Sequence, residues 1–245
     1  MFETLLTQPL YNGFVYLINV MPGGDVGLAI VLLTCIIRFL FYPVFASQIR
    51  STMGMQAMQP EIEELKTKYK NNREEQSRQM LALYKKYKVN PFSLILSLFI
   101  QIPIFIALYF TFFHTTLPNI NAALLYSFVK VPELINIHFL GFINLTLSHD
   151  LLLVVVVGIL QYLVTHVSLA RTKTGQSHLS EEKLAIQQMQ QKIMLYFLPG
   201  LIAVITYTTP AAVGLYFAVG SLISLGQEWL IRRQMQAESL KKASK

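Results

Sequence analysis

Long apolar stretches alternate with shorter polar segments along this chain, and five stretches are long enough, or nearly so, to cross the roughly 30 Å hydrocarbon core of a bilayer. They are residues 26–45, 92–113, 151–170, 193–207 and 211–231. Pro199 and Pro210 bracket the fourth stretch, which is the shortest. We expect it to form a tight hairpin with the fifth stretch, because proline interrupts a helix at such positions. The pattern predicts an all-α polytopic membrane protein with five transmembrane helices.

The longest polar segment, residues 51–88, carries two runs of apolar residues at helical spacing. Met58, Ile62, Leu65 and Tyr69 form the first run, and Met80, Leu83 and Tyr87 form the second. Steps of three and four residues place each run on one face of a helix. The segment is therefore predicted to be an antiparallel helical hairpin with an apolar seam and charged outer faces.

Composition supports the membrane class, since 53% of the 245 residues are hydrophobic and only 13% are charged. A soluble domain usually carries about 25% charged residues. The net charge of +7 is read as basic loops facing an anionic membrane surface, and not as a nucleic-acid site, so no DNA partner is expected. Cys35 is the only cysteine, which excludes an internal disulfide.

The distribution of Lys and Arg predicts how the chain is oriented. Nine lie in residues 46–91, four in residues 171–192 and five after residue 231, whereas Lys130 is alone on the other side and Arg38 lies within a span. Positive residues favour the cytosolic side. The N-terminus is therefore predicted outside and the C-terminus in the cytosol. Residues 1–25 are expected to form an outer interfacial segment, residues 26–235 the membrane-embedded core, and residues 236–245 a basic tail.

The motifs of common enzyme classes are missing from the sequence. It has no zinc-protease His-Glu-x-x-His, no Gly-x-Ser-x-Gly, no phosphate-binding loop and no dinucleotide fingerprint. The predicted spans also contain no pair of carboxylates. We therefore expect no catalytic activity, no cofactor and no metal site.

Polar side chains are nevertheless distributed over the predicted spans. They include Thr34 and Arg38 on the first span, Ser97 and Gln101 on the second, Gln161 and Thr165 on the third, and Ser221, Ser224 and Gln227 on the fifth. In lipid, such groups turn toward one another or toward water. For any single serine, threonine or glutamine, simple helix-to-helix hydrogen bonding is an open alternative to a functional role.

Arg38 is different because an arginine at membrane depth costs between about 2.5 and 17 kcal/mol, depending on how the cost is estimated. Glu228 lies only at the cytosolic end of the fifth span, and no other acidic residue lies within the spans to pair with Arg38. A cation without a fixed partner needs water, which predicts a hydrated cavity open to the cytosol that attracts acidic groups. The alternative is that the side chain only reaches toward the membrane surface.

Several short motifs, in order and spacing, resemble the YidC/Oxa/Alb membrane-protein insertase family over about residues 5–235. They include Val26-Gly27-Leu28-Ala29-Ile30 leading to Arg38, Tyr42-Pro43, Met58-Gln59-Pro60-Glu61, Asn90-Pro91, Gln101-Ile102-Pro103, Leu198-Pro199-Gly200 and Leu215-Tyr216-Phe217. The resemblance implies a hydrophilic groove that is open to the cytosol and sideways to lipid. It also implies that Arg38 is the groove arginine, Gln161 its polar partner and Phe217 its aromatic partner. Many family members carry tryptophan where this chain has Phe217, which keeps a ring for a cation–π contact but lacks the indole N–H.

The resemblance further implies a function in the bacterial cytoplasmic membrane: inserting client membrane proteins and helping them fold. The client-binding groove would contain Arg38, Thr34, Gln101, Gln161, Thr165, Phe217, Ser221 and Ser224, and the hairpin would receive the client. Nascent clients, the ribosome, the Sec translocon, signal-recognition components and membrane lipids are the expected partners. A small-solute (anion) transporter or channel that uses Arg38 is the alternative function.

Overall fold

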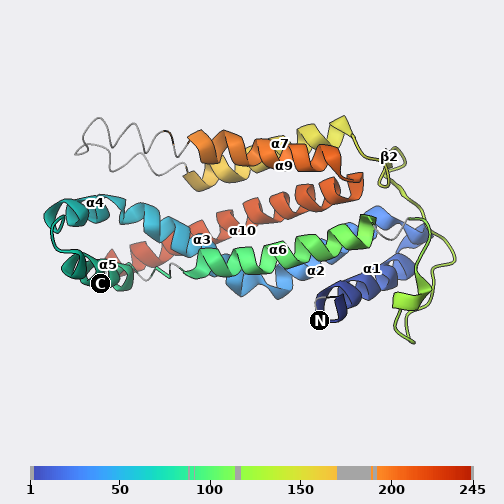
Figure 1. Ribbon diagram of the computed structural model, residues 1–245, viewed down its shortest axis with the longest axis horizontal. Helices are drawn as coiled ribbons and strands as arrows, with labels where there is room; N and C mark the ends of the chain where they lie inside the picture. The colour runs from blue at the N-terminus through green and yellow to red at the C-terminus, as the bar shows by residue number, and fades with distance from the viewer. Residues whose placement is uncertain are drawn as a thin grey trace.

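The computed structural model of the protein describes residues 3–87, 89–90, 92–113, 117–169, 189 and 192–243, and they are mostly helical (Figure 1). The long helices are α1 (Gln8–Val20), α2 (Val26–Leu40), α3 (Tyr42–Ala57), α4 (Gln59–Lys68), α5 (Arg73–Lys86), α6 (Phe92–Phe113), α7 (Leu151–Leu169), α9 (Leu198–Thr208) and α10 (Ala211–Ala243). Shorter turns are η1 (Glu3–Thr7), η2 (Pro22–Gly24), η3 (Ala122–Leu124) and η5 (Ile193–Phe197), and the strands are β1 (His138–Phe139) and β2 (Ile143–Asn144).

Side-chain caps mark where several helices begin. The carboxylate of Asp25 accepts a hydrogen bond from the backbone of Leu28 at the start of α2, and Asp150 accepts one from Leu153 at the start of α7. Asn72 caps α5 in the same way. Each cap satisfies a backbone N–H that has no partner within its helix, so these short polar residues place the helix ends.

The first apolar stretch, residues 26–45, does not form one continuous helix. It breaks at Phe41, and α2 and α3 meet there at an angle of 67°. Pro43 lies in the first turn of α3, where it has no N–H to donate to the preceding turn and its ring clashes with the carbonyl one turn back. Proline therefore divides the stretch into two helices.

Figure 1 shows α10 in the middle of the bundle, with α7 and α9 along one side and α2 and α6 along the other. Helix α1 packs beside α2 and α6. The main buried cluster joins these helices and includes Phe14, Ile18, Val26, Ile30, Leu145, Leu153, Val213 and Tyr216. It occupies the end of the bundle that carries the loop between α6 and α7.

That loop is fastened to the bundle by its backbone. Asn136 exchanges hydrogen bonds with Gly24 and Val26, and Leu145 accepts one from Ala212 at the start of α10. Gly24 has a positive φ of 65°, and a Cβ added there would lie 1.9 Å from the carbonyl oxygen of Leu134. Glycine is therefore required where the loop crosses the start of α2.

The helical hairpin consists of α4 and α5, which project from the opposite end of the bundle (Figure 1). Its buried cluster contains Met58, Ile62, Leu83 and Val89, with Met55, Met80, Tyr84 and Tyr87 packed against it. Leu65 and Tyr69 are half-buried and lie outside this cluster. Most of the predicted seam therefore packs together, and Val89 closes it at the base of the hairpin.

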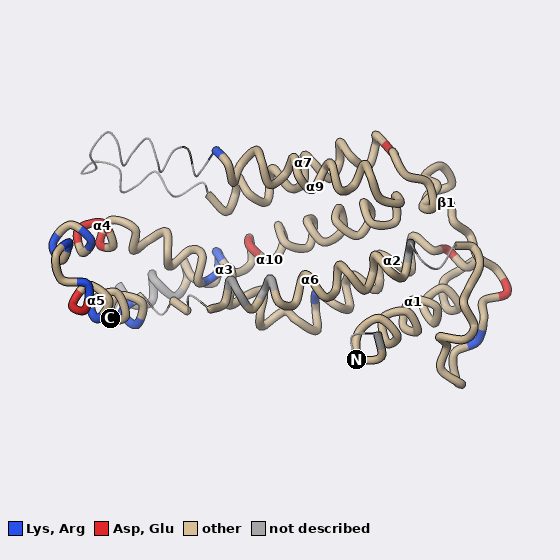
Figure 2. The backbone as a smooth tube through the Cα atoms, viewed as in Figure 1, with Lys and Arg blue, Asp and Glu red and all other residues tan. Residues whose placement is uncertain are grey.

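Charged residues gather at the hairpin end and are sparse along the bundle (Figure 2). The outer surface of the bundle is apolar instead, with Leu28, Leu32 and Ile36 exposed at successive turns of α2. On α7, Val155 and Ile159 are likewise exposed. A charged end and an apolar flank are the arrangement expected of a protein that sits in lipid.

Among the described residues, α7 alone has the length and hydropathy to cross a membrane by itself, and α2 with α3 meets the same criterion only across their 67° bend. The apolar segments Phe99–Thr111 and Ile193–Thr208 are shorter. The number of transmembrane helices and the orientation of the termini therefore stay predictions. The segment 170–188, most of the predicted basic loop after the third span, lies outside the described residues, as do residues 244–245 of the tail.

Candidate functional site

A cavity of about 240 Å³ lies where α2, α3, α6, α7 and α10 approach one another. Eight of the eleven residues that line it have polar side chains; the lining consists of Arg38, Phe45, Gln48, Ile49, Thr52, Gln101, Val164, Ser168, Ser224, Gln227 and Glu228. Of the residues expected in the groove, the cavity brings together Arg38, Gln101 and Ser224. Because five helices contribute, the cavity depends on the packing of the whole bundle.

The guanidinium of Arg38 lies over the ring of Phe45, with 4.5 Å between Cζ and the ring centroid. Arg38 is in the last turn of α2, and Phe45 follows the bend in the first turn of α3. A ring face attracts a cation without neutralising it, and the attraction reaches about 2 kcal/mol or more when water is excluded. Phe45, which is buried, is thus the aromatic partner of Arg38.

A glycine on α10 leaves room for the arginine. A Cβ added at Gly220 would lie 3.1 Å from Nη2 of Arg38. The guanidinium therefore packs almost directly on the backbone of α10. Any branched side chain at Gly220 would occupy the space that the guanidinium now fills.

Tyr216 and Gln101 connect α10 to α6 beside the arginine. Nε2 of Gln101 donates a hydrogen bond of 2.7 Å to the hydroxyl of Tyr216, which is buried. Arg38 and Tyr216 are also close enough to interact electrostatically. The sequence does not single out Tyr216, although it lies in the Leu215-Tyr216-Phe217 motif, because the resemblance assigns the aromatic role to the neighbouring Phe217.

All four hydroxyl groups expected in the groove donate to the carbonyl one turn earlier in their own helix. Thr34 donates to Ile30 (2.7 Å), Thr165 to Gln161 (2.9 Å), Ser221 to Phe217 (2.7 Å) and Ser224 to Gly220 (2.9 Å). Such bonds satisfy the hydroxyl without joining two helices. Of these four donors, only Ser224 lines the cavity.

The structure does not bring Gln161 or Phe217 into the lining of the cavity. Gln161 is half-buried on α7. The ring of Phe217 packs against Phe105 on α6, with 5.6 Å between the centroids. The aromatic contact that the resemblance assigned to Phe217 is thus made by Phe45 in this structure.

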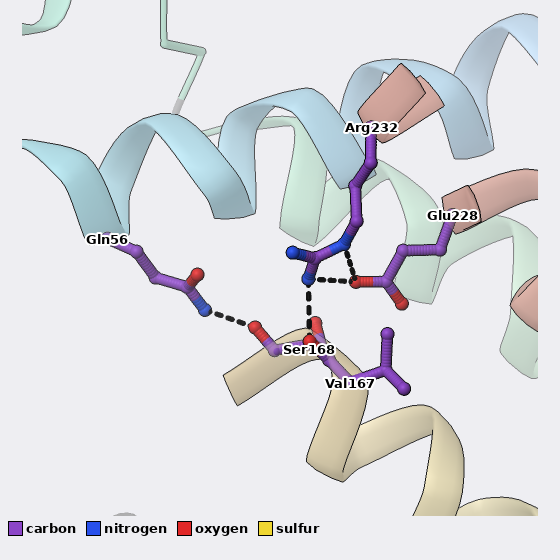
Figure 3. Close-up of polar contacts among 5 residues, drawn as sticks. All are labelled: Gln56, Val167, Ser168, Glu228 and Arg232. Atoms are coloured by element: carbon purple, nitrogen blue, oxygen red, sulfur yellow. Dashed lines mark hydrogen bonds and ion pairs between the residues drawn. The ribbon is translucent and has the colours of Figure 1, made fainter. Parts of the chain in front are cut away.

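The last turn of α7 is held by side chains from two neighbouring helices (Figure 3). Nη2 of Arg232 on α10 donates to the carbonyl of Val167 at 2.6 Å, and Nε2 of Gln56 on α3 donates to the carbonyl of Ser168 at 2.6 Å. The last carbonyls of a helix have no partner within it, and a cation is favourable at this end. These two contacts tie α7 to α10 and α3 beside the cavity.

Glu228 lines the cavity but is already paired. Its carboxylate accepts hydrogen bonds from Nε and Nη2 of Arg232, at 3.2 and 2.6 Å, and its side chain is almost fully buried. Among the described residues, Arg38 has no acidic partner. The cavity therefore contains one carboxylate that is already paired and one cation, Arg38, that contacts the ring of Phe45 but pairs with no described carboxylate.

A second polar cluster lies on the hairpin. The ammonium of Lys86 donates to both carboxylate oxygens of Glu61, at 2.9 and 2.7 Å, and the hydroxyl of Tyr87 donates to the same carboxylate. The hydrogen bond from Lys86, followed by that from Tyr87, lowers the pKa of Glu61 below its ordinary value. The same contact with Glu61 raises the pKa of Lys86. No group of three or more His, Cys, Asp or Glu side chains suited to a metal ion occurs in the described part of the chain.

Comparison with known proteins gives one consistent result. Residues 17–239 match the family model described as 60Kd inner membrane protein. The chain is 34% identical over 215 residues to the membrane protein insertases YidC of Francisella tularensis subsp. novicida (strain U112) and of F. tularensis subsp. holarctica (strain LVS). The aligned region is 87% of this chain and 34% of each relative, so the chain spans about a third of the length of the relatives it matches.

Proposed function

This chain belongs to the 60Kd inner membrane protein family, the family of the YidC insertases, and we propose that it inserts client membrane proteins into the bacterial inner membrane and helps them fold. The observation that carries the proposal is the unpaired Arg38 in a polar cavity within an apolar bundle. A half-buried cation within an apolar bundle, without a fixed counter-ion, is costly, which favours a functional role over a structural one.

The proposed topology has five membrane-spanning segments, with the N-terminus outside and the C-terminus in the cytosol. Residues 1–25 would lie at the outer surface, residues 26–235 would form the insertase core, and residues 236–245 would be a cytosolic tail. The arrangement is supported by the predominance of Lys and Arg in the segments assigned to the cytosol. It is also supported by the charged hairpin that projects from one end of the bundle (Figure 2).

In the proposed mechanism, the cavity receives the hydrophilic outer segment of a client. Arg38 binds an acidic group of that segment, while Gln48, Gln101 and Ser224 offer hydrogen bonds to other polar groups. Each contact replaces part of the hydration that the segment loses in the bilayer. The cavity thereby lowers the cost of moving a short polar segment through a low-dielectric region.

The apolar segment of the client would then pass along α7 and α10 into lipid. A leucine-like residue at the bilayer centre contributes about −0.3 to −0.6 kcal/mol, so a ~20-residue segment supplies several kcal/mol. The membrane potential adds about 2.3 kcal/mol per charge for each 100 mV. Insertion therefore needs no nucleotide.

We propose that the hairpin of α4 and α5 receives the client before it enters the cavity. The ribosome, the Sec translocon, signal-recognition components and membrane lipids are the proposed partners on this side. The apolar cluster around Met58 and Leu83 keeps the two helices together, while their outer faces stay charged. The anion-transporter alternative is not favoured, because the related proteins are named as insertases.

The test is insertion into liposomes of a single-span client in two forms, with an acidic or a neutral outer tail. Protection of the tail from added protease measures insertion. Arg38→Ala should lower insertion of the acidic form by about ten- to 100-fold, since a hydrogen bond to a charged group contributes about 1.5–3 kcal/mol. Arg38→Lys should be milder. Arg233→Ala is the matched control, because Arg233 is exposed and stacks on Trp229 outside the cavity.

If Arg38→Ala inserts both clients as the unmodified protein does, the role assigned to the arginine is wrong. If the unmodified protein protects neither tail but releases a trapped small anion from the liposomes, the insertase proposal itself fails.

A further inference from the structure

Three charged side chains meet at the cavity: Arg38 and Glu228 in its lining, and Arg232 beside Glu228. Arg232 is bound at two points, to the Glu228 carboxylate and to the carbonyl of Val167 at the end of α7 (Figure 3). One carboxylate thus lies in a cavity region with two cations, and it is bound to Arg232 alone among the described residues.

The pairing matters because the ionised carboxylate of Glu228 is too buried to be stable without an opposite charge beside it. Its side chain is 6% exposed, and removing one partner of a buried ion pair leaves a charge with nothing to balance it. Among the described cavity residues, Arg38 is the only other cation. Without Arg232, Arg38 is therefore the cation of the described lining with which the Glu228 carboxylate can pair.

The geometry allows that exchange. Nη2 of Arg38 packs beside Gly220, which lies eight residues before Glu228 on α10 and so about 12 Å along the helix. Side chains on a helix lean toward its N-terminus, so a freed Glu228 leans toward Ser224 and Gly220. The side chain of Glu228 then covers part of the remaining distance across the cavity, and the long side chain of Arg38 covers the rest.

We propose that Arg232 is a positioning residue that holds the Glu228 carboxylate away from Arg38, and so keeps Arg38 free to bind acidic client groups. Glu228 is in this sense a built-in competitor of the client, restrained by its neighbour one turn along α10. The inference rests on the proposed function, since it concerns the availability of the arginine for a client.

The test compares Arg232→Gln, Glu228→Gln and the double variant in liposomes, each with the acidic-tailed and the neutral-tailed client. Arg232→Gln should lower the ratio of acidic to neutral insertion by about tenfold, the size of a charge interaction of about 1.4 kcal/mol across a partly shielded site. Glu228→Gln should not lower the ratio, because it removes the competing carboxylate and leaves Arg38 free. The double variant should restore it, although it still lacks the bond from residue 232 to Val167.

Restoration of the ratio in the double variant would show that Arg232 acts by restraining the Glu228 carboxylate, and not by its hydrogen bond to Val167 at the end of α7. Equal losses in Arg232→Gln and in the double variant would show that Arg232 acts only by holding α7, and would overturn the inference. An unchanged ratio in Arg232→Gln, or an equal fall for both clients, overturns it as well. Arg233→Gln controls for loss of positive charge at this end of α10. If the unmodified protein inserts neither client, the proposed function fails, whereas these patterns can fail while insertion itself proceeds.

Discussion

The contact between Arg38 and Phe45 can be tested by mutation, because it joins two side chains on different helices, α2 and α3. The perturbation is Phe45→Leu, which keeps a large apolar side chain but removes the ring. Phe45 is only 5% exposed, and the guanidinium carbon lies 4.5 Å from its centroid. Because Arg38 is half-buried, the contact lies between the exposed and desolvated limits of a cation–π interaction and should contribute about 1–2 kcal/mol.

Phe45→Leu also removes buried apolar area, which costs about 1 kcal/mol whether or not an arginine is nearby. A double-mutant cycle separates the two effects. Phe45→Leu, Arg38→Met and the double variant are unfolded by denaturant in detergent micelles, and the free energies of unfolding are compared. The interaction energy between the two changes should be about 1–2 kcal/mol.

Ile62→Val provides the matched control, because Ile62 belongs to the hairpin cluster and does not line the cavity. Combined with Arg38→Met, it should be additive within about 0.3–0.5 kcal/mol. If Phe45→Leu and Arg38→Met are equally additive, the ring does not stabilise the cation and the reasoning is refuted. In the insertion assay, Phe45→Leu should also weaken the preference for acidic tails by a few-fold, since the guanidinium loses its fixed position.

Two further predictions concern the hairpin. A Cβ at Gly54 would lie 2.3 Å from a methyl group of Val89, so Gly54→Ala should destabilise the base of the hairpin by about 1–3 kcal/mol, seen as a lower unfolding midpoint and faster proteolysis between α3 and α6. Gly200→Ala, where a Cβ meets nothing within 4 Å, should leave both unchanged or slightly improved. Because Lys86 lowers the pKa of Glu61, that carboxylate stabilises the hairpin above its ordinary pKa of 4.5, and the stabilisation is lost as the pH falls through the lowered folded value. The difference in unfolding midpoint between the unmodified protein and Glu61→Gln should therefore shrink between about pH 6 and pH 3, and a constant difference would contradict the assignment.

The sequence was sufficient to predict a helical membrane protein of the YidC/Oxa/Alb family, and both points are confirmed. Apolar spacing also located the hairpin helices, because a seam of two facing helices depends on local periodicity. The bend at Phe41 was not predicted, although Pro43 was visible. Proline at this position is compatible either with one helix that continues through a kink or with the start of a new helix. Packing of α3 against α6 and α10 decides between the two.

Some residues of the candidate site could likewise be identified from the sequence, and others could not. Arg38 stands out in the sequence because a charge within an apolar stretch is rare. Phe45 and Tyr216 do not stand out, since aromatic residues are common in such stretches and only the three-dimensional packing selects the ones beside the guanidinium. The hydroxyl groups, in contrast, were predicted to belong to the groove, although most of them do not line the cavity. Thr34 was predicted to contribute to the groove, but its hydroxyl donates to the carbonyl of Ile30 within its own helix.

Glu228 and Arg232 show why the charge state of the cavity was beyond sequence reasoning. Their spacing of four residues favours an ion pair on any helix, usually on an exposed face where it contributes little. Here α7 ends beside them, and the carbonyl of Val167 accepts a second hydrogen bond from Arg232, which fixes the position of its guanidinium. The position of one helix end thus decides which cation holds the carboxylate, and with it whether Arg38 is available. A chain in which α7 ended one turn earlier would keep the same charged residues on α10 but lose the carbonyl that helps to hold them apart from Arg38.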